Sequence, residues 1–230
     1  MMVDISISSC PRICPALVVM LVSAPFVNSQ PVESLVMEID KPERMEAIET
    51  EVTEYTDQDG TKIIQSASDF HILTDVGIDK LYDTFADRDA QTDILPRVRE
   101  YQWEPLNSPE SEHVDAVLET QVVGIQFMGF DGTYRLRNKS ELIDRRDKTP
   151  RRVLLRYEMV ESLDGKLESS SGVYLLEETS VGGENYTYMR HQNTIEFRDT
   201  FLGLKTILRR FAPRDTERMF NAIIEAARNR

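Results

Sequence analysis

The sequence predicts an α+β protein built mainly from an antiparallel sheet of about six to seven strands, with short helices after the first core strand and a long C-terminal helix. Three observations support this prediction. Apolar and polar residues alternate from Pro96 to Arg198, which is typical of half-buried strands. Short turn sequences interrupt the alternation, as they do between the antiparallel strands of a hairpin. The last residues carry apolar side chains at helical spacing.

The composition fits a folded globular chain and excludes several classes of partner. The 230 residues are 40% hydrophobic and 29% charged, which is the profile of a protein with a core. There are 27 basic and 40 acidic residues, giving a formal net charge of −13. This excess of acid counts against nucleic-acid binding and against docking on anionic lipid. The three histidines show no ligand spacing and no spaced Asp/Asn loop with a closing Glu occurs, so we predict no metal. The sequence also lacks a P-loop and a G-x-G-x-x-G motif, and we predict no cofactor.

Residues 1–29 have the order of a secretory signal peptide. Arg12 precedes an apolar run, Ile13–Val27, and polar residues then lead to a cleavage site before Gln30. The run is about 15 residues long and a membrane span needs about 20; an uncleaved anchor is the alternative. Both cysteines lie in this segment. We therefore expect export to the periplasm or the extracellular space, with no cysteine and no transmembrane segment in the mature chain.

Residues 30–60 form an acidic leader, and residues 61–230 form the main domain. The leader carries 10 acidic residues. We expect it to be partly extended, with a strand near Ala47–Tyr55. The turn Asp57–Gly60 then closes that strand against a first core strand, Thr61–Leu73.

Helical periodicity replaces the alternation after this first core strand. Apolar residues recur at intervals of three and four within Asp75–Asp93, and a second short helix over Asp87–Ile94 stops before Pro96. The further strands are expected near Val98–Glu104, His113–Phe127, Thr133–Ile143, Arg151–Glu161, Lys166–Glu178 and Tyr186–Arg198.

A long helix is expected at the C-terminus, where Pro213 suits its first turn. The apolar stripe of this final helix consists of Met219, Phe220, Ile223, Ile224 and Ala227.

This order of elements resembles the helix-grip fold of the START-like (SRPBCC) superfamily, which includes polyketide cyclases and ubiquinone-binding START-like proteins. Two segments carry the resemblance: SASDFHILTDVGIDKLYDTFADRDAQTDILPRVREYQW at 66–103 and APRDTERMFNAIIEAARNR at the C-terminus. It covers roughly residues 61–230 and lies in layout and hydrophobic pattern, without a catalytic motif. The resemblance implies a curved sheet wrapped around the terminal helix, with a cavity between them for a lipid, a quinone or a similar apolar molecule.

Alternation within the strands indicates which side chains face this cavity, because residues two apart share a side of a strand. The inward faces combine apolar residues with polar ones, and buried polar groups need hydrogen-bond partners that a ligand can supply. The alternative is that a slip in register inverts the assignment. The candidate cavity residues are Tyr134, Asn138, Ser140, Tyr157, Met159, Met189, His191, Asn193, Phe220 and Ile224.

We predict a carrier or binding protein for an apolar small molecule, with no catalytic residue assigned. One alternative is an enzyme of the cyclase or hydrolase kind, in which His191 acts with Tyr157 or Asn193, because histidine titrates near neutral pH. Another is an envelope interaction module that uses the acidic leader and has a filled interior. The sequence leaves these three hypotheses open.

Overall fold

The computed structural model describes residues 46–105, 116–127, 130–146, 149–198 and 200–230. The predicted signal peptide, residues 1–29, and the first part of the acidic leader lie outside these ranges. Within the described residues, no helix is both long enough and apolar enough to cross a membrane.

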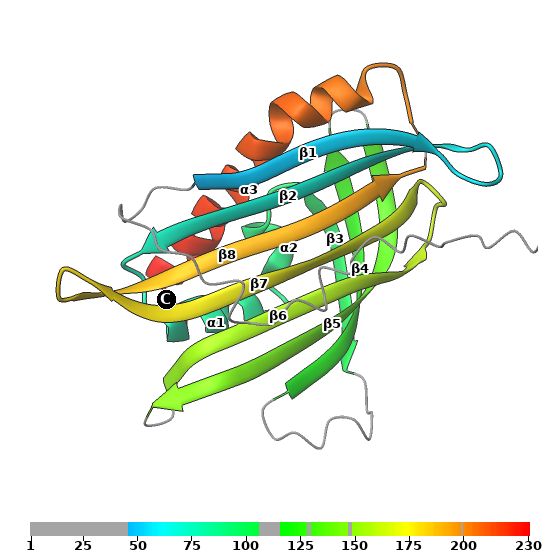
Figure 1. The fold of residues 1–230 in the computed structure, drawn as a ribbon. Helices are drawn as coiled ribbons and strands as arrows, with labels where there is room; N and C mark the ends of the chain where they lie inside the picture. Colours follow the sequence, from blue (N-terminus) through cyan, green and yellow to red (C-terminus); the bar gives the residue numbers. More distant parts are fainter. Residues whose placement is uncertain (1–45, 106–115, 128–129, 147–148, 199) are drawn as a thin grey trace, which may run out of the picture.

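The described strands form one antiparallel sheet of eight strands, in the order β1-β2-β8-β7-β6-β5-β4-β3 (Figure 1). This is slightly more than the six to seven strands expected, because the strand from the acidic segment joins the sheet as β1. The boundary expected at residue 60 therefore lies inside the β1–β2 hairpin. The strands are β1 Glu46–Thr56, β2 Lys62–Thr74, β3 Val98–Pro105, β4 Ala116–Phe127, β5 Phe130–Arg146, β6 Thr149–Ser162, β7 Leu167–Val181 and β8 Glu184–Phe197.

The described residues also form three helices, α1 (Ile78–Ala86), α2 (Gln91–Ile94) and α3 (Leu204–Arg228). They lie on the same side of the curved sheet, and α3 runs along it behind β1 and β2 (Figure 1). The predicted α+β architecture, a curved antiparallel sheet around a long C-terminal helix with short helices after the first core strand, is confirmed.

The start of the C-terminal helix differs from the prediction. The helix begins at Leu204, and Pro213 lies in its interior instead of its first turn. An interior proline costs about 3 kcal/mol, because it cannot donate to the carbonyl one turn earlier. Leu204 and Leu208 are almost completely buried, and burying two such side chains contributes about 3–6 kcal/mol. Tertiary burial therefore extends the helix through the proline.

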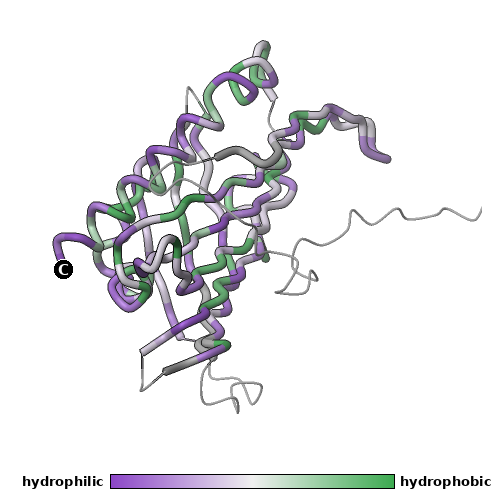
Figure 2. The backbone as a smooth tube through the Cα atoms, turned by 60° about the vertical axis from the view of Figure 1, so that its left-hand side comes forward, coloured by the Kyte–Doolittle hydropathy of each residue, from purple (hydrophilic) through white to green (hydrophobic). Residues whose placement is uncertain are grey.

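Two clusters of buried side chains hold the helices against the sheet. The first joins α1 and the C-terminal half of α3 to the sheet, with Phe70, Met189 and Phe220 at its centre. The second joins the start of α3 to the other end of the sheet and includes Phe197 and Leu208. Figure 2 shows the alternation of hydrophobic and hydrophilic residues along the strands that produces this inner apolar face.

Candidate functional site

A cavity of about 330 Å³ lies between the inner face of the sheet and the helices α2 and α3. Its apolar walls come from both core clusters, for example Leu155 and Met219 beside the first and Leu136 and Leu208 in the second. Ligand pockets in proteins have volumes of about 300–1,000 Å³ and mostly apolar walls with a few placed polar groups. The space between the two clusters therefore has the size and lining of a small-molecule site.

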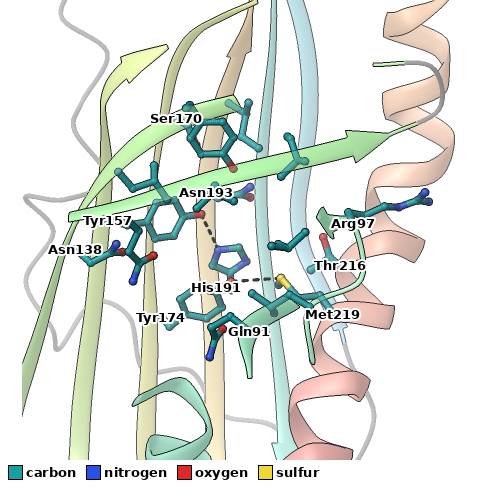
Figure 3. A pocket seen from close by; sticks show the side chains of 18 of the residues that line it. Gln91, Arg97, Asn138, Tyr157, Ser170, Tyr174, His191, Asn193, Thr216 and Met219 are labelled. Atoms are coloured by element: carbon teal, nitrogen blue, oxygen red, sulfur yellow. Dashed lines mark hydrogen bonds between the residues drawn. The ribbon is translucent and has the colours of Figure 1, made fainter. Parts of the chain in front are cut away.

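The structure brings six of the ten sequence-predicted residues to this cavity. Figure 3 shows several of them on neighbouring strands around His191. The residues that line it are Tyr134, Asn138, Ser140, Tyr157, His191 and Asn193.

The other four predicted residues do not line the cavity. Met189, Phe220 and Ile224 belong to the first core cluster, where α3 packs directly on the sheet. Met159 packs against the second cluster. A side chain that points to the inner face of the sheet therefore does not always line the cavity. The position of α3 on that face decides which inward side chains it covers and which border open space.

Several lining residues were not singled out from the sequence. Ser66 and Ser68 on β2, and Ser170 and Tyr174 on β7, belong to inward faces that the same alternation could have identified. Gln91 lies in the short helix α2, where no strand periodicity exists to predict its direction.

A hydrogen bond links Tyr157 and His191, which both line the cavity (Figure 3). The hydroxyl oxygen of Tyr157 lies 3.1 Å from Nε2 of His191. Tyr157 is on β6 and His191 on β8, so the tyrosine must reach across β7. It does so over Gly172, its register partner, where an added Cβ would lie 2.4 Å from the tyrosine oxygen. The missing side chain at Gly172 therefore makes the contact possible.

Aromatic packing fixes the imidazole of His191 in place. Tyr174 stacks on it with ring centroids 4.0 Å apart and an interplanar angle of 7°. The hydroxyl of Tyr174 in turn lies 3.3 Å from the sulfur of Met219 on α3. Phe220 meets the imidazole edge-on at 6.3 Å. The ring is thus held by the sheet on one side and by α3 on the other.

Burial keeps these groups uncharged. It lowers the pKa of His191 to about 3, so the imidazole is neutral at physiological pH. Burial also raises the pKa of Tyr157 well above its usual value and that of Tyr134 to about 12. The deep wall of the cavity therefore presents neutral hydrogen-bonding groups.

Three buried polar atoms of the cavity lining have no hydrogen-bond partner among the described residues. They are Nδ1 of His191 on β8, Nδ2 of Asn138 on β5 and Oδ2 of Asp215 on α3. When the Tyr157 hydroxyl donates to Nε2, the neutral imidazole carries its proton on Nδ1. The two unpartnered nitrogens are then donors, and each such group costs about 1–3 kcal/mol when left unsatisfied.

Two charged residues of the cavity lining form an ion pair with each other. Arg97, which follows α2 and has the unusual positive φ of 90°, donates to Asp215 on α3 at 2.9 Å. This ion pair joins the segment before β3 to the helix. No group of three or more histidine, cysteine, aspartate or glutamate side chains that could hold a metal ion occurs within the described ranges.

The buried histidine predicts a pH-dependent stability. Below pH 6.5 the unfolded chain takes up a proton at His191, but the folded chain does so only near pH 3. Stability should therefore fall as the pH drops from 6.5 toward 3, by about 1.4 kcal/mol per pH unit from this residue. Urea unfolding of the wild type and of His191→Gln at several pH values measures the difference. Parallel curves for the two proteins would contradict a depressed pKa.

Comparison with solved structures identifies the fold. The chain is similar to the Zhui aromatase/cyclase from Streptomyces sp. R1128, with a TM-score of 0.50, 15% identity, and coverage of 72% of this chain and 95% of that one. It is also similar to a STAR-related lipid transfer protein fragment from Xanthomonas axonopodis, with a TM-score of 0.50, 11% identity, and coverage of 77% and 98%. The chain has the START-like helix-grip fold. No protein-family model matches the sequence, and no curated protein matches it.

The START-like fold expected from the order of elements is therefore confirmed. At identities this low, the similarity concerns the fold alone. The function of the cavity in this chain must be inferred from its own residues.

Proposed function

We propose that this START-like protein binds and carries an apolar small molecule with a neutral hydrogen-bond acceptor. The observation that carries the proposal is the cavity of about 330 Å³ with unpartnered buried groups on His191 and Asn138. An apolar ligand body would cover the aliphatic and aromatic walls. A carbonyl or ether oxygen would satisfy the donors that the protein leaves without partners.

The electrostatics favour a neutral ligand in the deep part of the cavity. The imidazole of His191 and the phenol of Tyr157 are both neutral there. A charged ligand group would lose its hydration without gaining an opposite charge from these residues, which is costly. Lipids, quinones and related carbonyl compounds have the required chemistry.

The depressed pKa of His191 supports a carrier over the enzyme hypothesis. With a pKa of about 3, His191 is a weak proton acceptor, and it bonds to a neutral tyrosine. General-base catalysis works best when the pKa of the base lies close to the working pH. The volume of the cavity likewise disfavours an interaction module with a filled interior.

We further propose that the carrier is exported. The support for this is the signal-peptide pattern of residues 1–29 and the absence of cysteine from the rest of the sequence. N-terminal sequencing of the protein recovered from a secreting host should find Gln30 as the first residue. A full-length chain that stays in the cytoplasm would refute export without affecting the cavity.

Extraction of the purified protein followed by mass spectrometry tests ligand binding. We expect a co-purified apolar compound with a carbonyl or ether oxygen. Ala212→Trp, which fills the cavity from α3, should remove it and reduce its binding at least tenfold, because the indole would occupy the space of the ligand. Asn221→Trp is the matched control, since Asn221 is exposed on the same helix.

Two outcomes would refute the carrier function. One is a protein that neither yields nor takes up any apolar compound. The other is equal loss of binding in Ala212→Trp and Asn221→Trp, which would place the bound compound outside the cavity.

A further inference from the structure

A second hollow adjoins the cavity near the end of α1. This hollow, which we call the vestibule, has a volume of about 370 Å³. It lies among the end of α1, the turn after it, and strands β3, β5 and β6. Its lining residues are Tyr82, Phe85, Ala86, Asp87, Arg88, Asp89, Trp103, Ser140 and Leu155.

Four residues line both the cavity and the vestibule, so the two spaces meet at a shared boundary. These residues are Phe85, Arg88, Ser140 and Leu155. Ser140 and Leu155 are register partners on the adjacent strands β5 and β6. Phe85 is on α1, so the boundary lies between that helix and one cross-strand pair.

The wall of this passage is suited to an apolar chain. Phe85 packs on Tyr174 with ring centroids 5.0 Å apart, and Tyr174 stacks on His191. A row of aromatic rings therefore leads from the deep polar group at His191 to the vestibule. Trp103 on β3 also lines the vestibule, and 45% of its surface is exposed to solvent.

The two acidic residues of the vestibule are absent from the lining of the inner cavity. Asp87 and Asp89 belong to the turn between α1 and α2, and Asp87 pairs with Arg230 at the C-terminus. Arg88 and Ser140 are the polar residues of the shared boundary, and the guanidinium of Arg88 donates to the carbonyl of Phe85. The passage thus has aromatic and aliphatic walls with two polar side chains at its narrow part and carboxylates only at its outer end, which suits a long molecule that leaves one end near solvent.

We propose that the ligand is an elongated apolar molecule that spans both spaces, with its acceptor oxygen beside His191 and its far end beside Trp103. The proposal rests on the proposed carrier function and adds the shape of the ligand and its path. A compact ligand would occupy the inner cavity alone. An elongated one gains from every additional methylene that it buries, about fourfold in affinity each.

Tryptophan fluorescence tests the proposal, because Trp103 is the only tryptophan in the sequence. The probes are 2-octanone, 2-hexadecanone, and 2-hexadecanone brominated at its chain end, with binding measured by calorimetry. We expect the long ketone to bind much more tightly than the short one. The brominated long ketone should quench Trp103, and 2-octanone should leave its emission unchanged.

Two buried serines provide a matched pair of variants. Ser140 lines both spaces, whereas Ser170 lines the inner cavity and is absent from the vestibule lining. Ser140→Leu should close the passage and reduce the affinity of 2-hexadecanone at least tenfold, with a clearly smaller loss for 2-octanone, which does not enter the passage. Ser170→Leu should weaken both ketones to a similar extent. Circular dichroism of each variant verifies that it is folded.

The outcomes separate this proposal from the carrier function. Binding of both ketones with equal affinity, or tight binding without quenching of Trp103, would refute the elongated ligand and leave the carrier function standing. If neither ketone nor any extracted compound binds, the carrier function itself is refuted. If Ser140→Leu and Ser170→Leu changed the ratio of long-ketone to short-ketone affinity equally, the proposed path would also be overturned.

Discussion

Phe220→Ala should lower the free energy of unfolding by about 3–5 kcal/mol, the usual cost of truncating a fully buried phenylalanine. Phe220 has no exposed surface and lies in the first core cluster, where α3 contacts the sheet and α1. Its ring also meets His191 edge-on. The substitution would therefore leave a void between the helix and the sheet and loosen the wall of the cavity. Urea unfolding measures the loss.

Phe211→Ala provides the control on the same helix. Phe211 is half-buried, so the same truncation there should cost less than half as much. Equal losses at the two positions would show that α3 is not held by the core cluster around Phe220.

Asp69→Ala should destabilise the protein by a similar amount, about 3–5 kcal/mol, for an electrostatic reason. Arg190 donates two hydrogen bonds to Asp69, at 2.8 and 2.6 Å, and its side chain is only 7% exposed. Gln192 donates a third hydrogen bond to the same carboxylate. Removing the carboxylate would leave a buried guanidinium without its counter-charge. These residues point away from the cavity, so ligand affinity in the folded variant should stay unchanged.

The exposed ion pair between Lys62 and Glu54 serves as the comparison for Asp69. Its nitrogen–oxygen distance is 3.0 Å, but the two side chains are 58% and 35% exposed. Glu54→Ala should therefore cost less than about 1 kcal/mol. A loss at Asp69 no greater than that at Glu54 would mean that solvent reaches the buried pair.

Part of the candidate site followed directly from the sequence. Alternation along β5, β6 and β8 turned Asn138, Tyr157 and His191 toward one space, because a strand places every second side chain on the same side. The choice among inward residues could not be made in this way. Met189 and His191 are two positions apart on β8, yet only His191 lines the cavity, because α3 covers its neighbour.

The sequence by itself determined the fold class, the order of the elements and the inward faces of the strands. These properties depend on local periodicity, because the spacing of apolar residues in a strand or helix indicates which of its faces is buried. Tertiary structure alone decided the start of α3 at Leu204 and the Tyr157–His191 contact across Gly172. It also decided where the cavity opens between two packed clusters. These features depend on how distant segments pack and align, and a local pattern carries no information about the register between strands or the space left between helix and sheet.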